Sequence, residues 1–403
     1  MKFILSLAML LFAFCVAASA QVAPAATGGG ATLSYVFRYS QTVETGTALG
    51  TWQTVIPSAS VDYANGAGRL PFSLNYVGGY TGTISGPTFG TGFFQRLLIS
   101  QGIVWRKWNA TVSDDVSYTP STPTTGFSGI PGIGEPVEGS GPPSDQSILT
   151  LKTHVVNNVA SGNVSHSLNY ATTFSAGCSS ELRRYPDANG LNINQLMANA
   201  QLTRRLNARN SLLGTYSFSQ FSYPDFSFSF QSNAVLFGLK RSWNPKITSS
   251  MSAGPEWKGS SNSAVVPSSM TVAANADVIY QYRFVTASLT YARAANNGGG
   301  NLFGAESDSV IANYTREFGK KLTLGVTGDY RHLSGLINNG VTNSKFGGAQ
   351  ATRKFGRHFT GFANYTVIDQ SSSSPLPANA LTSLVQVFGF GISYTPQKTH
   401  LVN

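Results

Sequence analysis

The chain has 403 residues, of which 11% are charged and 12% are aromatic, and it contains 42 glycines. Soluble domains usually carry about 25% charged residues, so this composition argues against an ordinary cytosolic enzyme. No apolar run after the N-terminal segment approaches the roughly 20 residues of a membrane-spanning helix. Few charges and many aromatics without such a helix are typical of a β-barrel with one face in lipid and one in water.

The N-terminus predicts export. Residues 1–20 have the form of a cleaved signal peptide, with Lys2 as the positive start, an apolar core from Phe3 to Val16, and the cleavage site Ala18-Ser19-Ala20. A flexible segment is expected over residues 21–30, a barrel over 31–394 and a tail over 395–403. The exported chain keeps only Cys178, which excludes an intramolecular disulfide framework.

Alternating strand patterns fill the rest of the chain. A first strand is predicted at 32–39, followed by a connector of about 17 residues and a strand at 58–64 that ends in the hairpin signal Asn65-Gly66. Short turns between alternating segments are then predicted along the chain, at 65–68, 106–109, 158–162, 204–207, 241–246, 282–284, 315–321 and 352–357. With a last strand at 384–394, they predict an all-β, transmembrane, antiparallel up-and-down barrel of about 18 strands, with about 16 as the alternative.

An even number of strands places the first and last strand ends on one side, together with the short turns. We therefore expect short periplasmic turns and long extracellular loops. The longest predicted loop, Thr119–Gln146, is rich in proline and glycine. It has two interpretations, a solvated surface loop or a segment that folds inward and narrows the lumen.

The alternation in 308–331 separates a lipid face from a lumen face. Leu322, Leu324, Val326 and Tyr330 are expected to face lipid, because they occupy every second position of a strand. The opposite positions supply candidate lumen-lining residues. Together with one residue of an earlier strand, these candidates are Asp277, Thr323, Thr327, Asp329 and Arg331.

Basic residues gather at the predicted turns, where many stand two positions before an aromatic. Most of the formal net charge of +10 therefore belongs to one rim rather than to a nucleic-acid-binding surface. Such residues either form a girdle at anionic lipid headgroups or simply solvate the turns. The candidate periplasmic-rim girdle consists of Arg106, Trp108, Arg204, Arg241, Trp243, Arg316, Phe318, Arg353 and Phe355.

Signals for enzyme chemistry are absent from the sequence. The five histidines lack metal-ligand spacing, and no nucleophile elbow, phosphate-binding loop or zinc-protease motif occurs. Asp114 and Asp115 are adjacent on a predicted strand, so their side chains should point to opposite faces and cannot share one catalytic pocket. We predict no enzymatic activity, no cofactor, no metal and no nucleic-acid partner.

The hairpins resemble those of bacterial outer-membrane β-barrel proteins of the porin type. The segments 71–76, 209–211 and 252–257 resemble an uncharacterised exported barrel family common in acidobacteria. This resemblance implies a place in the outer membrane of a Gram-negative cell, with outer-membrane lipid, the barrel-assembly machinery and small solutes as partners. The last strand, with Phe388, Phe390, Ile392 and Tyr394 in alternation, resembles the C-terminal assembly signal of such barrels, although a tail follows it.

Three functions follow from these patterns. The first is a passive, weakly selective diffusion pore for small solutes, because barrels of 16 to 18 strands leave an aqueous channel. The second is a structural or export barrel whose lumen is closed by loops or occupied by a partner such as a polysaccharide. The third is a secreted soluble β-sandwich adhesin, which the regularly spaced Phe226, Phe228 and Phe230 disfavour, because no matching surface charge accompanies them.

Overall fold

The computed structural model describes residues 31–46, 50–66, 68–86, 91–121, 153–186, 191–262, 266–298, 302–337, 340–373, 384–396 and 399–401. The predicted signal peptide, the segment 21–30 and residues 122–146 of the predicted long loop lie outside this part of the chain. In the described ranges, no helix is both long and apolar enough to cross a membrane.

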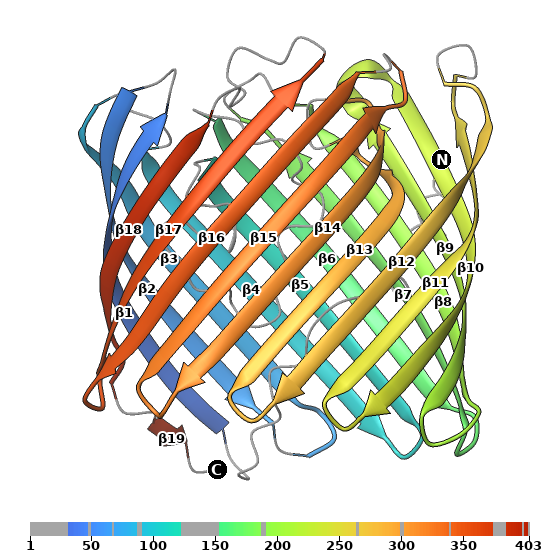
Figure 1. Cartoon of the computed structure of the whole chain (residues 1–403), viewed down its shortest axis with the longest axis horizontal. Helices are drawn as coiled ribbons and strands as arrows, with labels where there is room; N and C mark the ends of the chain where they lie inside the picture. Colours follow the sequence, from blue (N-terminus) through green and yellow to red (C-terminus); the bar gives the residue numbers. More distant parts are fainter. Residues whose placement is uncertain are drawn as a thin grey trace, which may run out of the picture.

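Antiparallel strands make up almost the whole described chain (Figure 1). In chain order they are β1 (Ala31–Gly46), β2 (Gly50–Asn65), β3 (Phe72–Ser85), β4 (Gly92–Trp105), β5 (Trp108–Ser121), β6 (Thr153–Ser167), β7 (Thr172–Arg184), β8 (Ile193–Arg205), β9 (Asn210–Tyr223), β10 (Phe228–Asn244), β11 (Ile247–Ser260), β12 (Ser269–Tyr282), β13 (Val285–Asn296), β14 (Ala305–Phe318), β15 (Leu322–Gly335), β16 (Val341–Phe355), β17 (Phe359–Ser372), β18 (Val385–Tyr394) and β19 (Thr399–Leu401).

The sheet closes on itself. Each strand from β1 to β18 pairs with its sequence neighbours, and β1 also pairs with β18 from Phe37↔Tyr394 to Gly46↔Val385. Closure removes the free sheet edges that would otherwise expose unpaired N–H and C=O groups. The predicted barrel of about 18 strands is thus confirmed, and the soluble β-sandwich is wrong, because a sandwich needs two separate sheets.

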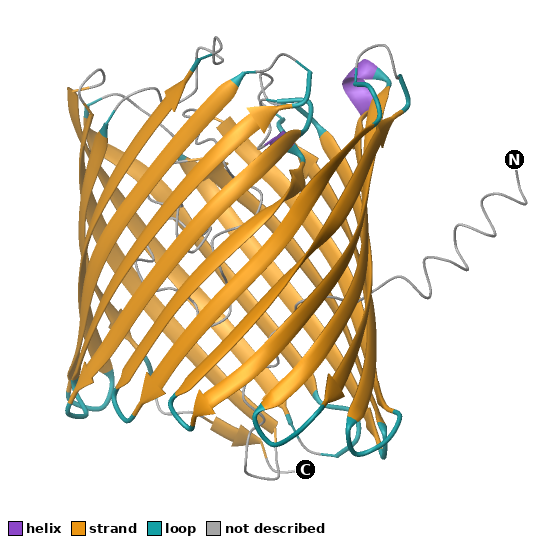
Figure 2. Ribbon diagram, turned by 45° about the vertical axis from the view of Figure 1, so that its right-hand side comes forward, coloured by secondary structure: helices purple, strands orange, loops and turns teal. Residues whose placement is uncertain are grey.

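The two ends of the barrel differ in their connections (Figure 2). At the short-turn end, a few residues join β2 to β3, β4 to β5 and every second pair onward, up to β16 and β17. The turn between β12 and β13, for example, contains only Arg283 and Phe284. Gly319 and Gly356 lie in two of these turns with φ of +63° and +78°, a backbone conformation that glycine adopts without strain. The opposite, loop end carries the other connections, including the 3-10 helix η2 (Pro224–Phe226).

One predicted turn is wrong. No turn forms at 158–162, which lies within strand β6. Asn158 and Gly162 both pair there with residues of β5 and of β7. The actual turn lies at 168–171, where the Asn169 side-chain oxygen accepts the backbone N–H groups of Ala171 and Thr172 at 2.9 Å each. The returning strand, β7, is therefore absent from the sequence prediction.

The predicted connector after the first strand is also wrong. Both flanking strands extend into it, so that only residues 47–49 separate β1 from β2. The sequence pattern missed these extensions because their inward positions, such as Thr42, Glu44 and Thr54, are polar and resemble a loop. Past the end of β18, the short strand β19 pairs with Ala31–Leu33 of β1 and continues the ladder within the predicted tail.

Candidate functional site

The wall of the barrel has an apolar outer face and an inner face on which polar side chains predominate. On β15, Val326 is 55% exposed and Tyr330 is 40% exposed, whereas Arg331, which points the opposite way, is 6% exposed. On β18, Phe388 and Phe390 are each 51% exposed, and the alternate residue Val387 is buried. Because this alternation persists around the closed sheet, the barrel presents large apolar side chains outward. Its inner face carries polar side chains together with buried apolar clusters, such as that of Ile56, Val77 and Phe94.

The candidate lumen residues all occupy the inner face. On β15, Thr323, Thr327, Asp329 and Arg331 share one face, opposite the exposed Leu324, Val326 and Tyr330. The structure brings two of them together, because Asp329 and Arg331 form an ion pair of 2.9 Å. Asp277 is not part of this group, because it lies on β12 opposite Ser250 and Thr290 of its neighbouring strands.

Two further ion pairs line the inner face. On adjacent strands β4 and β5, Arg96 binds both carboxylate oxygens of Asp115, at 3.0 Å from Nε and 2.6 Å from Nη2. On β7, Glu181 and Arg183 form a buried pair of 2.6 Å, in which each occupies an inward position. Sequence reasoning missed all four, although two opposite charges at positions i and i+2 of a strand, as in 181 and 183, are a usable signal.

The connection between β13 and β14 crosses the interior. Asn297 is fully buried, and its side-chain N–H group donates to Gln195 of β8 at 3.1 Å. Its backbone oxygen accepts the hydroxyl of Tyr223 on β9 at 2.8 Å. Neither β13 nor β14 pairs with β8 or β9 in the sheet, so a contact from this connection to inward residues of β8 and β9 requires that the connection lies inside the barrel. We call the described residues of this segment, 293–298 and 302–308, the inner hairpin.

Aromatic packing holds Phe303 and Gly304 of the inner hairpin against β9, η2 and β10. The Phe303 ring lies 5.3 Å from Tyr223 and 4.7 Å from Phe226. Gly304 has a φ of +79°, and a Cβ atom at this position would overlap the ring of the buried Phe230. The regularly spaced phenylalanines of β10 thus have an unpredicted role, because Phe228 and Phe230 face the inner hairpin and not lipid.

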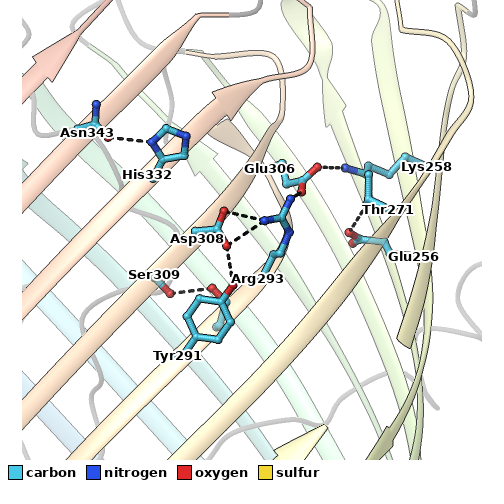
Figure 3. A network of polar contacts seen from close by, with 11 residues as sticks. Glu256, Lys258, Thr271, Tyr291, Arg293, Glu306, Asp308, Ser309, His332 and Asn343 are labelled. Atoms are coloured by element: carbon cyan, nitrogen blue, oxygen red, sulfur yellow. Dashed lines mark hydrogen bonds and ion pairs between the residues drawn. The ribbon is translucent and has the colours of Figure 1, made fainter. Parts of the chain in front are cut away.

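Polar contacts anchor the base of the inner hairpin to the near wall (Figure 3). Glu256 of β11 accepts the backbone N–H of Ala295 at 3.1 Å, and the hydroxyl of Ser232 donates to it at 2.6 Å. Two residues along β11, the Lys258 ammonium pairs with Glu306 of β14 at 2.6 Å, and its side chain is only 1% exposed.

A second cation extends this network toward the wall of β13 and β14. Arg293 pairs with Glu306 and, at 3.2 Å, with Asp308. The Tyr291 hydroxyl also donates to Asp308, at 2.7 Å. The network therefore links β11, β13 and β14 at the point where the pairing of β12 with β13 stops, at Ala274↔Arg293. These contacts join the inner hairpin to β11.

The candidate rim residues lie at the short-turn end of their strands. Cations stand over aromatic rings in three of the predicted pairs, Arg241 on Trp243 at 4.1 Å, Arg316 on Phe318 at 4.6 Å and Arg353 on Phe355 at 5.5 Å.

The other rim candidates differ in their neighbours. Trp108 stacks on His166 with a centroid distance of 4.0 Å, next to the turn that contains Arg106. Two positions after Arg204 stands Leu206 and not an aromatic residue.

The adjacent carboxylates of β5 face opposite ways. Asp115 points inward to Arg96, whereas Asp114 is exposed on the outer face and accepts the Asn158 amide at 2.9 Å. They do not form one pocket. In the described part of the chain, no three side chains of the metal-binding types lie together.

Neither a protein-family model nor a curated protein matches this chain. Solved structures are similar to it at low identity. The crystal structure of Pseudomonas aeruginosa OccK2 (OpdF) has a TM-score of 0.48 and 11% identity over 91% of this chain and 97% of that chain. Acinetobacter baumannii OccAB4 has a TM-score of 0.49 and 13% identity over 94% of this chain and 100% of that chain. Pseudomonas aeruginosa OpdK with vanillate has a TM-score of 0.46 and 11% identity over 91% of this chain and 99% of that chain.

Proposed function

We propose that this barrel is an outer-membrane pore through which small solutes diffuse passively. The observation that carries the proposal is the closed wall of strands β1 to β18, with exposed apolar side chains outside and ion-paired polar side chains inside. An apolar outer band suits lipid, and a closed barrel satisfies every backbone group of the wall without water. A barrel of this strand number is wide enough for an aqueous channel.

Paired charges support weak charge selection. In three pairs, Arg96 with Asp115, Glu181 with Arg183 and Asp329 with Arg331, an inward cation lies beside an anion. A permeating ion then meets dipoles rather than a ring of one sign, and only a ring of one sign would exclude one class of ion. Asp277, with Ser250 and Thr290 as neighbours, adds a modest preference for cations.

Planar-bilayer recording of the folded protein tests the pore. We expect stable unitary currents and a reversal potential near zero in a salt gradient, because the three inward ion pairs carry no net charge. Complete absence of conductance from protein that shows the mobility shift of a folded barrel on unheated gels would contradict the proposal. A strong preference for either sign of ion would contradict weak selection alone.

The inner hairpin favours a second candidate, a barrel whose lumen is closed until a partner or an exported polymer displaces this element. It crosses from β13 and β14 to β8 and β9 and is held at both ends. Replacing residues 297–303 with a short Gly-Ser turn decides between the two. Conductance that appears only in this variant supports the closed barrel, whereas similar conductance in both proteins supports the open pore.

We also propose that export through a cleaved signal peptide and insertion by the barrel-assembly machinery place the short turns on the periplasmic side. The rim cations then meet lipid headgroups, because the Arg241–Trp243 and Arg316–Phe318 pairs combine a cation with an interfacial aromatic. Protease added outside intact cells should cut tags inserted in loop-end connections and spare tags in the short turns. The reverse pattern would overturn this orientation.

A further inference from the structure

The wall is interrupted where β13 leaves β12 at the loop end. The two strands pair as far as Ala274↔Arg293, and beyond this point both continue without pairing to each other. β12 remains in the wall, because it stays paired with β11 up to Ser269. β13 stays paired with β14 up to Asn296, so the inner hairpin bends away from β12 as one two-stranded unit.

The alternation of backbone hydrogen bonds identifies the groups that lose a partner at this fork. Two hydrogen bonds of 2.8 Å set its phase, from Gln281 N–H to Lys246 and from Glu317 N–H to Phe284. Even-numbered residues of β12 and odd-numbered residues of β13 therefore bond to each other. Continued past the fork, this register brings Val272 opposite Ala295 as a hydrogen-bonded pair. Among the described residues, Val272 has no ladder partner on the side of β13.

Other groups of the molecule replace the missing partners of the inner hairpin. The N–H of Ala295, which would donate to β12 in a continued ladder, donates to the Glu256 carboxylate at 3.1 Å. The next hydrogen-bonded position of the same register pairs Asn297 with Met270. There the backbone oxygen of Asn297 accepts the hydroxyl of Tyr223 at 2.8 Å. Two successive positions of the hairpin thus have substitute partners, one from β11 and one from β9.

The edge of β12 that faces the fork is left accessible. Met270 and Val272 are 64% and 56% exposed. At about 3.3 Å per residue and a tilt of about 40°, the fork begins about 20 Å above the short-turn end of β12, near the loop-end boundary of an apolar band about 25 Å high. Unpaired backbone groups are tolerated at this boundary, because water reaches them there. They also form a ready template for a strand.

The ion pairs of the inner hairpin are compatible with a return to this edge. Arg293 pairs with Glu306 and Asp308, and all three belong to the hairpin, so these pairs move with it (Figure 3). Lys258 belongs to β11 instead, so a hairpin that returns to the wall loses the ion pair between Lys258 and Glu306. Glu306 then keeps Arg293 as its cation and is not left as an unpaired carboxylate.

We propose that the inner hairpin moves between two positions, the bent one and one in the wall where it rejoins β12 through Val272↔Ala295 and Met270↔Asn297. The bent hairpin crosses the lumen, whereas the rejoined hairpin leaves it, so the movement gates the solute path. Each of these backbone hydrogen bonds has a counterpart in the other position, as expected of an element with two discrete arrangements. The gating rests on the pore proposed above, and the movement itself does not.

Disulfide trapping in the full chain tests the movement. A hydrogen-bonded pair of antiparallel strands has Cα atoms about 5.5 Å apart, a separation that suits a disulfide. In a Cys178→Ser background, Val272→Cys with Ala295→Cys should therefore cross-link under mild oxidation. Loss of free thiols measures the rate. No disulfide between these two positions would overturn the proposal.

Two control pairs on the same strands calibrate this rate. Val278→Cys with Leu289→Cys is a hydrogen-bonded pair within the ladder and should cross-link faster than the pair at the fork. Val272→Cys with Ala287→Cys is far out of register and should not cross-link. A disulfide that forms as fast in this last pair as in the pair at the fork would overturn the proposal, because it would report disorder and not a defined second position.

Tyr223→Phe tests the exchange of partners. It removes the hydroxyl that donates to Asn297 and keeps the ring, so trapping at the fork should become about fivefold faster, the change expected for loss of one neutral hydrogen bond. Tyr216→Phe is the matched control, because the Tyr216 hydroxyl bonds Asn233 and not the hairpin, and it should leave the rate unchanged. Equal rates in the two variants would overturn the exchange.

Bilayer recording of the protein with Val272→Cys and Ala295→Cys separates the gate from the pore. Oxidation should raise the unitary conductance, and a reducing agent should restore the lower value. Equal, non-zero conductance in both states would overturn the gating. Absence of current in both states would contradict the pore itself, whereas the trapping rates would still decide whether the hairpin moves.

Discussion

At the scale of single residues, the interior of this barrel is organised by short-range charge pairing. Asp329 and Arg331 stand two positions apart on β15, so both side chains point inward and meet at 2.9 Å. Arg96 and Asp115 achieve the same pairing across two adjacent strands. Each pair places a strong local dipole in the channel and adds no net charge. Selectivity therefore depends on whether both members are present.

Arg331→Gln should make the pore prefer cations, because Asp329 then loses this compensating charge. One unit charge at about 4 Å in water is worth about 1 kcal/mol, which sets an upper bound of about fivefold on the change in the cation-to-anion permeability ratio. The reversal potential in a salt gradient measures this ratio. The double variant Asp329→Asn with Arg331→Gln is the control and should return the ratio to the wild-type value. No change in the single variant would place this pair outside the ion path.

At the scale of elements, the alternation of residues predicted the wall well, whereas it predicted nothing of what the wall encloses. The hairpin of β14 and β15 was predicted from its two alternating segments and from Gly319 in the turn, and the structure has both. Strand β7 was missed because Asn158–Gly162 has turn-like composition. In the folded barrel these residues pair with β5, because strand pairing overrides the local preference of such residues for a turn.

The inner hairpin could not be predicted from its own sequence. Its position depends on contacts with residues distant in the chain, such as Gln195, Glu256 and Lys258. Periodicity reports which face of a strand a residue occupies and carries no information on where a strand end bends. For the same reason, Glu256 and Lys258 were not among the predicted lumen residues.

Lys258→Met should loosen the inner hairpin, because it leaves the largely buried Glu306 without one of its two cations. Loss of a buried charged hydrogen bond costs about 1–3 kcal/mol. The Ala295 amide, which donates to Glu256, should therefore exchange at least about fivefold faster. Hydrogen exchange by mass spectrometry measures this rate. The control Lys345→Met removes an exposed ion pair of 3.7 Å, which contributes little, and should leave exchange at Ala295 unchanged. Equal exchange in both variants would refute the anchoring role.

At the scale of the whole molecule, closure of the sheet means that a residue's position along its strand determines whether its side chain faces lipid or the lumen. Adjacent residues of one strand face lipid and lumen, so equal chemical changes at neighbouring positions should have unequal costs. This dependence on parity follows from closure, because an open sheet or a sandwich would bury one of its faces against protein. It also explains why polar inner positions and apolar outer positions alternate along the single strand β15.

Val326→Arg and Thr327→Arg test this consequence with neighbouring residues of β15. Val326 is 55% exposed on the outer face, so an arginine there must enter the apolar band, at a cost of about 2–4 kcal/mol near its middle. Thr327 faces inward, where its hydroxyl bonds Asn313 at 2.7 Å, and an arginine there can extend into a hydrated lumen. Urea unfolding in lipid vesicles measures both free energies. A larger loss for Thr327→Arg would reverse the assignment of the two faces, and with it the reading of the interior as the solute path.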